Sequence, residues 1–135
     1  MRMVLATLLS LAGIVGLFGP TDAYSDPRSH YLIHCMGCHL QDGSGTPPDV
    51  PVFDEGLLDL LKTDSGRAYL VQVPGGSQSP ISDEALTSVL NWTLREFGGL
   101  NESQALAPIS LDEVRKYRPM TLLNPVKTRA DMAVQ

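Results

Sequence analysis

The feature that most constrains this chain is the short motif CMGCH at residues 35–39. It contains the two cysteines of the sequence, Cys35 and Cys38, and His39 follows the second cysteine directly. A cysteine pair at this spacing serves one of three chemistries: thiol–disulfide exchange, part of a zinc site, or covalent attachment of haem. Each of them would organise a small core differently, so the choice decides what the chain can fold into.

Zinc and disulfide chemistry fit the surrounding sequence poorly. A structural zinc site needs four ligands, and the remaining histidines, His30 and His34, stand on the same short predicted helix as the cysteines. A thioredoxin-like pair usually follows a strand, and no strand pattern precedes Tyr31. A structural disulfide across so short a loop would add little stability.

Covalent haem attachment explains every part of the motif. Each thiol can add to one haem vinyl group, and the histidine next in line can bind the iron through its Nε2 atom. The sequence therefore predicts one covalently bound haem c, with Cys35 and Cys38 as the thioether residues and His39 as the proximal iron ligand.

The N-terminus predicts export, and haem is attached in this way outside the cytoplasm. Residues 1–23 have the layout of a secretory signal: Arg2, an apolar run from Val4 to Phe18, and small residues before the Ala23–Tyr24 bond. The apolar run is shorter than the roughly 20 residues that span a bilayer. We expect cleavage and a periplasmic location, with membrane association only if the segment is retained.

The charge of the chain excludes one class of partner. It has 10 basic and 15 acidic residues and a formal net charge of −5. Affinity for nucleic acid comes from lysine and arginine side chains that neutralise phosphates, so nucleic-acid binding is not expected. An acidic surface instead suggests a redox partner with a basic docking patch.

The sequence after the signal predicts an all-α fold, because no stretch shows the period of two that marks a strand. The clearest helix spans residues 83–97, where Ser82 is a good N-cap, Gly98 provides a stop and apolar residues recur at about 3.6 residues. Segments rich in glycine and proline predict loops over residues 40–53 and 73–82. The other expected helices run from Pro27 to near Gly37, over 54–63, over 66–72, over 111–118, and weakly from Asn124.

With CMGCH at the end of a first helix, residues 24–98 resemble a small class I c-type cytochrome of bacterial periplasms. The segment CHLQDGSGTPP resembles the loop that wraps the haem edge in that family, where a proline carbonyl often accepts the Nδ1–H of the proximal histidine. Pro47, Pro48 or Pro51 could supply this carbonyl.

The helix that contains Trp92 resembles the last core helix of the family, which carries an aromatic residue where it crosses the first helix. The resemblance implies about four helices around one haem, joined by long loops. Residues 99–135 then form a C-terminal extension that is partly helical.

The sequence departs from the family at the sixth iron ligand. The family usually places a methionine in the loop before the last core helix, but that loop, VPGGSQSPIS at residues 73–82, contains none. Met120, in the C-terminal extension, is the tentative candidate. The alternatives are weak approach by Gln78 or a loop serine, which leaves the site nearly open, and binding by His30 or His34.

The sixth ligand decides the chemistry of the iron. A methionine opposite histidine suits an electron carrier, whereas an open face admits oxygen, nitric oxide or carbon monoxide. The loop offers no histidine or arginine for acid–base catalysis; the nearest cation, Arg67, is expected to pair with a haem propionate or to face solvent.

We therefore expect an electron-transfer protein rather than an enzyme. It would carry single electrons between redox partner proteins of the periplasm, such as a dehydrogenase and an oxidase or reductase. The alternative is a haem-based binder or sensor of small ligands with an open sixth position.

Overall fold

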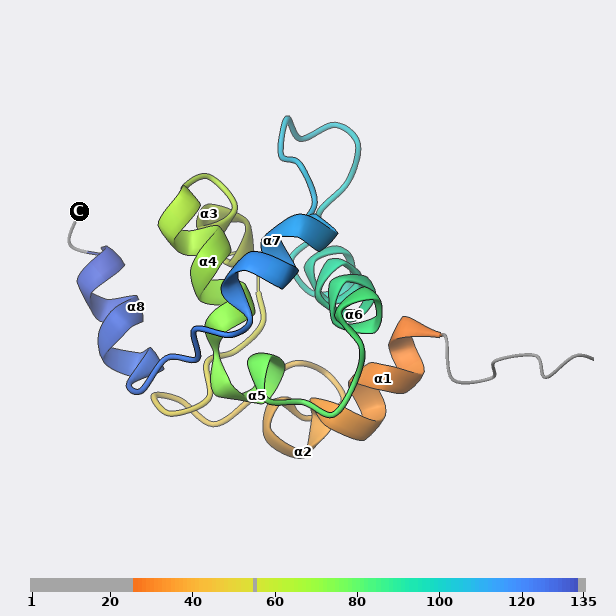
Figure 1. Ribbon diagram of the computed structural model, residues 1–135, viewed down its shortest axis with the longest axis horizontal. Helices are drawn as coiled ribbons and strands as arrows, with labels where there is room; N and C mark the ends of the chain where they lie inside the picture. Colours follow the sequence, from red (N-terminus) through yellow and green to blue (C-terminus); the bar gives the residue numbers. More distant parts are fainter. Residues whose placement is uncertain (1–25, 55, 134–135) are drawn as a thin grey trace, which may run out of the picture.

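The structure is a computed structural model that describes residues 26–54 and 56–133. The predicted signal, residues 1–23, lies outside the described residues. Within them the chain forms helices and loops, and its single β contact is an isolated bridge between Thr46 and Val50, which confirms the all-α prediction (Figure 1). The helices are α1 (Pro27–His34), α2 (Met36–His39), α3 (Leu57–Leu60), α4 (Asp64–Gln72), α5 (Pro74–Ser77), α6 (Asp83–Glu96), α7 (Leu111–Tyr117) and α8 (Pro125–Ala133).

Helix ends agree with the sequence at the caps that it identified, whereas α4 begins at Asp64, after a cap at Thr63, two residues before its predicted start. Helix α6 follows Ser82, whose side chain accepts a hydrogen bond from the Ala85 N–H. The predicted first helix is divided into α1 and α2, because Cys35 departs from helical geometry with a φ of −119°. The single turn α5 lies in a segment predicted as a loop and begins at Pro74, a residue suited to the first position of a helix.

The core forms where α1 crosses α6. Tyr31 of α1 is fully buried, and its ring lies 5.1 Å from that of Trp92 and 5.3 Å from that of Phe97. Leu86 and Leu94 of α6 are each only 2% exposed. Complete burial of such a side chain contributes about 1.5–3 kcal/mol, so this crossing is a main source of stability.

The C-terminal extension packs into the same core. Helix α7 contacts α4 and α6, and α8 contacts α4. Ile109 and Val114 are 2% and 0% exposed. The side-chain amide of Asn91 donates to the Ile109 carbonyl and accepts from the Ile109 N–H, both at 2.8 Å, so a residue of α6 holds the approach to α7.

Arg67 does not have the role expected from the sequence. Its guanidinium pairs with Glu113 and also donates to the backbone carbonyls of Ala107 and Pro108. The expectation that Arg67 faces solvent or a haem propionate is wrong, because the side chain is used to fasten α7 to α4. The sequence could not show this contact, since the partners lie 40 to 46 residues apart.

No helix in the described ranges is both long enough and apolar enough to cross a bilayer.

The Arg67–Glu113 pair generates a prediction for the pH dependence of stability. The hydrogen bond from Arg67 lowers the pKa of Glu113 from 4.5 to about 2, a larger effect than the opposing desolvation. A carboxyl whose pKa is depressed by folding stabilises the fold above its unfolded pKa and loses this contribution as the pH falls through the folded value. Glu113→Gln should therefore lower the free energy of unfolding at neutral pH by on the order of 2 kcal/mol.

Denaturant unfolding measured from pH 7 to acid should show the difference between wild type and Glu113→Gln shrinking below about pH 4.5. Glutamine preserves the capping box that Glu113 forms with Ser110. Ser110→Ala, which removes the hydroxyl from the box but keeps the ion pair, is the matched control; its cost in stability should depend less on pH, because Ser110 lowers the pKa of Glu113 less than Arg67 does. A wild-type advantage over Glu113→Gln that stays constant with pH would contradict the assignment.

Candidate haem site

The three motif residues lie on one side of a helical turn. Cys35 ends α1, and Cys38 and His39 belong to α2, three and four residues later. Residues at these spacings share a helix face. Cys35 is partly buried against the core, Cys38 is exposed, and both thiols are free. The predicted thioether residues and the predicted iron ligand are thus brought together.

Burial raises the pKa of the Cys35 thiol to about 11, and the neighbouring Cys38 adds to this shift. The Cys35 thiol is therefore protonated at neutral pH. Addition of an S–H across a vinyl group uses both the sulfur and the proton, so the neutral thiol carries all the atoms that thioether formation needs.

His39 is held as a neutral ring. Its burial lowers its pKa, while the backbone carbonyl of Pro51 acts in the opposite direction. The buried Nδ1 atom nevertheless makes no hydrogen bond of good geometry. Neutral imidazole is the form that ligates metals, so burial prepares His39 for iron. Among the three candidate prolines, the structure singles out Pro51 as the one whose carbonyl acts on this ring.

An aromatic contact fixes the plane of the His39 ring. The ring stacks on Phe53 with centroids 3.8 Å apart and planes 15° apart, and Phe53 in turn stacks on Phe97. The loop reaches this position because Gly45 has a φ of +62° and no side chain; a Cβ atom there would come within 2.8 Å of the Pro51 carbonyl oxygen.

Tyr31 supports the end of the motif, a role that the sequence analysis missed. Its hydroxyl donates to the Leu40 carbonyl at 2.6 Å. Leu40 has a φ of +54°, in the left-handed region that residues other than glycine rarely adopt. Burial raises the pKa of Tyr31 to about 12, so the hydroxyl remains a donor at physiological pH. The sequence feature that could have indicated this role is a tyrosine one helical turn before Cys35.

The loop predicted to face the iron, residues 73–82 (the distal loop), is fastened by the C-terminal extension. The Arg118 guanidinium donates to the carbonyls of Ser77 and Ser79 and to Asp83. The hydroxyls of Ser77 and Thr121 lie 3.0 Å apart. Residues 118–122 therefore run beside the distal loop. The sequence analysis missed both contacts, because nothing local links segments about 40 residues apart.

The candidates for the sixth ligand fall in different places. Met120 lies in the segment that accompanies the distal loop, and its side chain is 48% exposed. Gln78 is exposed, whereas Ser77 is buried and its hydroxyl also donates to the Val73 carbonyl. His30 and His34 stack on each other along α1, with ring centroids 6.0 Å apart.

These residues fit a covalently bound haem. Two thiols and a neutral, half-buried imidazole share one helix face. The Nδ1 atom of that imidazole is buried and makes no hydrogen bond of good geometry, although the Pro51 carbonyl acts on the ring. Over the described residues, no cluster of three or more histidine, cysteine, aspartate or glutamate side chains could hold a bare metal ion. The donor set is that of haem attachment rather than of zinc.

Two curated relatives are similar to this chain; both are from Thermus thermophilus and both are named cytochrome c-552. The first is 27% identical over 140 residues, which cover 90% of each chain. The second is 27% identical over 106 residues, which cover 65% of this chain and 81% of the relative. No protein-family model and no solved structure matches the chain.

The relatives and the local geometry agree. Both relatives bear the name of a c-type cytochrome, and the first covers 90% of this chain, so the similarity includes the motif and at least the first part of the C-terminal extension. The helical class around CMGCH is the one that the resemblance implied, but the described residues form eight helices, three of them of four residues, where about four were expected. Similarity to two proteins named cytochrome c-552 confirms the resemblance to small class I c-type cytochromes.

Proposed function

We propose that this protein is a periplasmic monohaem electron carrier. Cys35 and Cys38 hold the haem by thioethers, and His39 is the proximal ligand of its iron. The observation that carries the proposal is the placement of two thiols and a half-buried, neutral histidine on one helix face beside Pro51. When bound, the haem supplies a one-electron redox couple.

The chain supplies orientation and an apolar surrounding. Phe53 fixes the plane of the His39 ring by stacking, and the Pro51 carbonyl favours a proton on Nδ1, which leaves Nε2 available to iron. Phe53 and Phe97 form an apolar wall beside this histidine. A dry surrounding of this kind sets the reduction potential by disfavouring charge on the iron.

We assign Met120 as the sixth ligand. The distal loop contains no methionine, but the contacts of Arg118 and Thr121 bring residues 118–122 alongside it. Leu122 adds a backbone hydrogen bond to the Gln72 carbonyl at 3.0 Å. This path of the extension supports the assignment, because the family usually provides the methionine from within that loop.

The second candidate function is a haem-based binder or sensor of small ligands with an open sixth position. The exposure of Met120 favours it, because a side chain that is 48% exposed is not held in place by packing. The two functions differ in whether carbon monoxide meets a free coordination site on the ferrous iron.

The partners and the location follow from charge and from the N-terminus. The net charge of −5 favours a redox partner with a basic patch around its own redox centre, such as a periplasmic dehydrogenase or an oxidase. Residues 1–23 would direct the chain to the periplasm and be removed there. Catalysis is not part of the proposal, because the distal loop carries no acid–base side chain.

Covalent attachment is testable by extraction. The wild-type protein should keep its red colour through acid–acetone treatment, because thioethers do not release haem. Cys35→Ala and Cys38→Ala should each keep one thioether and give a pyridine haemochrome spectrum shifted toward that of a haem with one free vinyl group. Met36→Ala, inside the motif but without a thiol, is the control and should match wild type. Release of haem from the wild type would sink the proposal.

The sixth ligand is testable by spectroscopy. Ferric wild type should show the weak near-infrared charge-transfer band of methionine–iron ligation, and Met120→Ala should lose it, with a lower reduction potential and faster carbon monoxide binding to the ferrous form. Met132→Ala, which changes the other methionine of the extension, should leave all three unchanged. Absence of the band together with rapid carbon monoxide binding in the wild type would favour the ligand binder instead.

A further inference from the structure

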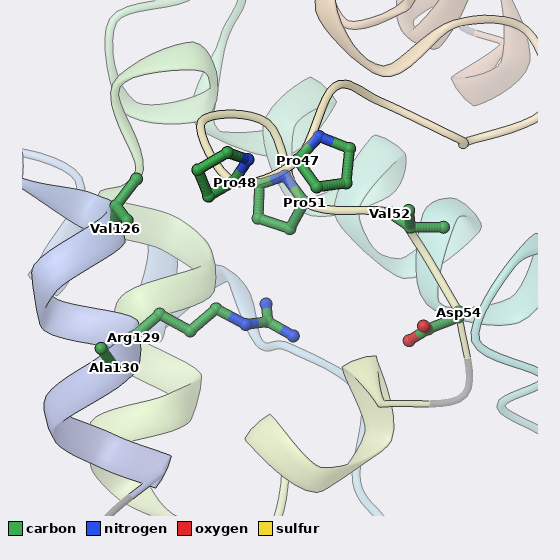
Figure 2. A pocket seen from close by; sticks show the side chains of 8 residues that line it. All are labelled: Pro47, Pro48, Pro51, Val52, Asp54, Val126, Arg129 and Ala130. Atoms are coloured by element: carbon green, nitrogen blue, oxygen red, sulfur yellow. The ribbon is translucent and has the colours of Figure 1, made fainter.

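A pocket of about 420 Å³ lies between the proline-rich loop, residues 46–54, and α8 (Figure 2). Three prolines and Val52 form the wall on the loop side, and one face of α8 forms the wall opposite. The charged side chains that line it are Arg129, from α8, and Asp54, from the loop. Figure 2 shows the Arg129 guanidinium reaching from the helix into the space below the prolines.

Arg129 differs from three arginines that form ion pairs and from Arg95, which is exposed to solvent. Arg67, Arg115 and Arg118 each contact a carboxylate. Arg129 is only partly exposed, yet no hydrogen bond or ion pair joins it to any of the residues described. A partly desolvated guanidinium is costly without an anion, and its planar fork of donors matches a carboxylate.

None of the residues in the described ranges, 26–54 and 56–133, supplies this anion. Asp54 lines the same pocket but forms no ion pair with Arg129 in the described part of the chain, and its Oδ1 accepts from the Gly56 N–H at 2.9 Å. On α8, Lys127 pairs with Asp131. On α4, which packs against α8, the charged residues are Asp64, whose side chain is exposed, and Arg67, which is paired with Glu113.

The pocket adjoins the haem site through Pro51. The ring of Pro51 lines the pocket, and its carbonyl acts on His39. In haem, the vinyl groups and the propionates lie on opposite edges of the macrocycle, so thioethers to α1 and α2 direct the propionates away from these helices. Figure 1 shows α8 at the left of the molecule, α1 at the right and α2 at the bottom.

The geometry points to Arg129 as the residue that binds a haem propionate, with the pocket as the propionate end of the haem site. This inference rests on the proposed function, since it requires a haem attached at Cys35 and Cys38. It gives α8 a specific role: the end of the C-terminal extension carries the cation that the sequence had placed at Arg67.

The test compares holoprotein variants that remove one positive charge from α8. Arg129→Gln removes the proposed partner of the propionate. Arg129→Lys keeps the positive charge but loses the planar group of N–H donors. Lys127→Gln is the matched control, because Lys127 is exposed and forms an ion pair within the helix. Haem content is measured first by pyridine haemochrome, then the reduction potential against pH, and the propionate bending bands by resonance Raman.

We expect Arg129→Gln to lower the reduction potential of the haem. It should also lower the acid dissociation constant of the propionate by about tenfold or more, because loss of a nearby cation raises the pKa of a carboxyl group. The propionate band should shift in Arg129→Gln and Arg129→Lys, while Lys127→Gln should match wild type. Should Arg129→Gln fail to give holoprotein, the Raman shift in Arg129→Lys decides.

Other outcomes overturn the proposal. Unchanged pH profiles and Raman bands, in variants with full haem content, would leave the proposed function standing and remove the role of Arg129. If the reduction potential changes with phosphate concentration in the wild type but not in Arg129→Gln, the pocket binds free inorganic anions instead. Absence of covalent haem in the wild type would remove both proposals together.

Discussion

The structure depends on the burial of Tyr31 at the crossing of α1 and α6. Its ring packs on Trp92 and Phe97, while its hydroxyl reaches the Leu40 carbonyl at the end of the haem motif. One side chain therefore joins the apolar core to the residues that would bind the cofactor. Because Leu40 has a positive φ, the turn that leaves the motif needs this support, and the position of His39 depends on it.

The C-terminal extension completes what the core begins. Three polar side chains join the extension to the rest of the chain. The side chains of Arg67 and Asn91 bind residues of the extension, whereas Arg118, within the extension, binds the distal loop. Together they hold α7 and the distal loop in place. The extension approaches the proposed haem site twice, with Met120 near the distal loop and Arg129 in the pocket beside Pro51. The extension is therefore the segment that would supply the proposed sixth ligand and the proposed counter-charge of the propionate.

Local signals in the sequence predicted the helices that have caps, and tertiary contacts decided the rest. Ser82 and Ser110 marked the starts of α6 and α7, because a side-chain oxygen that satisfies free N–H groups acts within one turn. The division of the first helix at Cys35 and the single turn at Pro74 went unpredicted, since packing of these short segments outweighs their weak intrinsic preferences. The role of Arg67 was wrong because its partner is 46 residues away.

By itself the sequence predicted the chemistry: two thiols and a histidine at fixed spacing indicate covalent haem, because these residues act through their own atoms at distances that the local chain sets. It determined the helical class as well, through periodicity and caps. Only the tertiary structure decided which proline acts on His39, which arginine faces the pocket and where the extension runs. These are contacts between segments far apart in the chain, and they arise from packing of the whole molecule rather than from any local pattern.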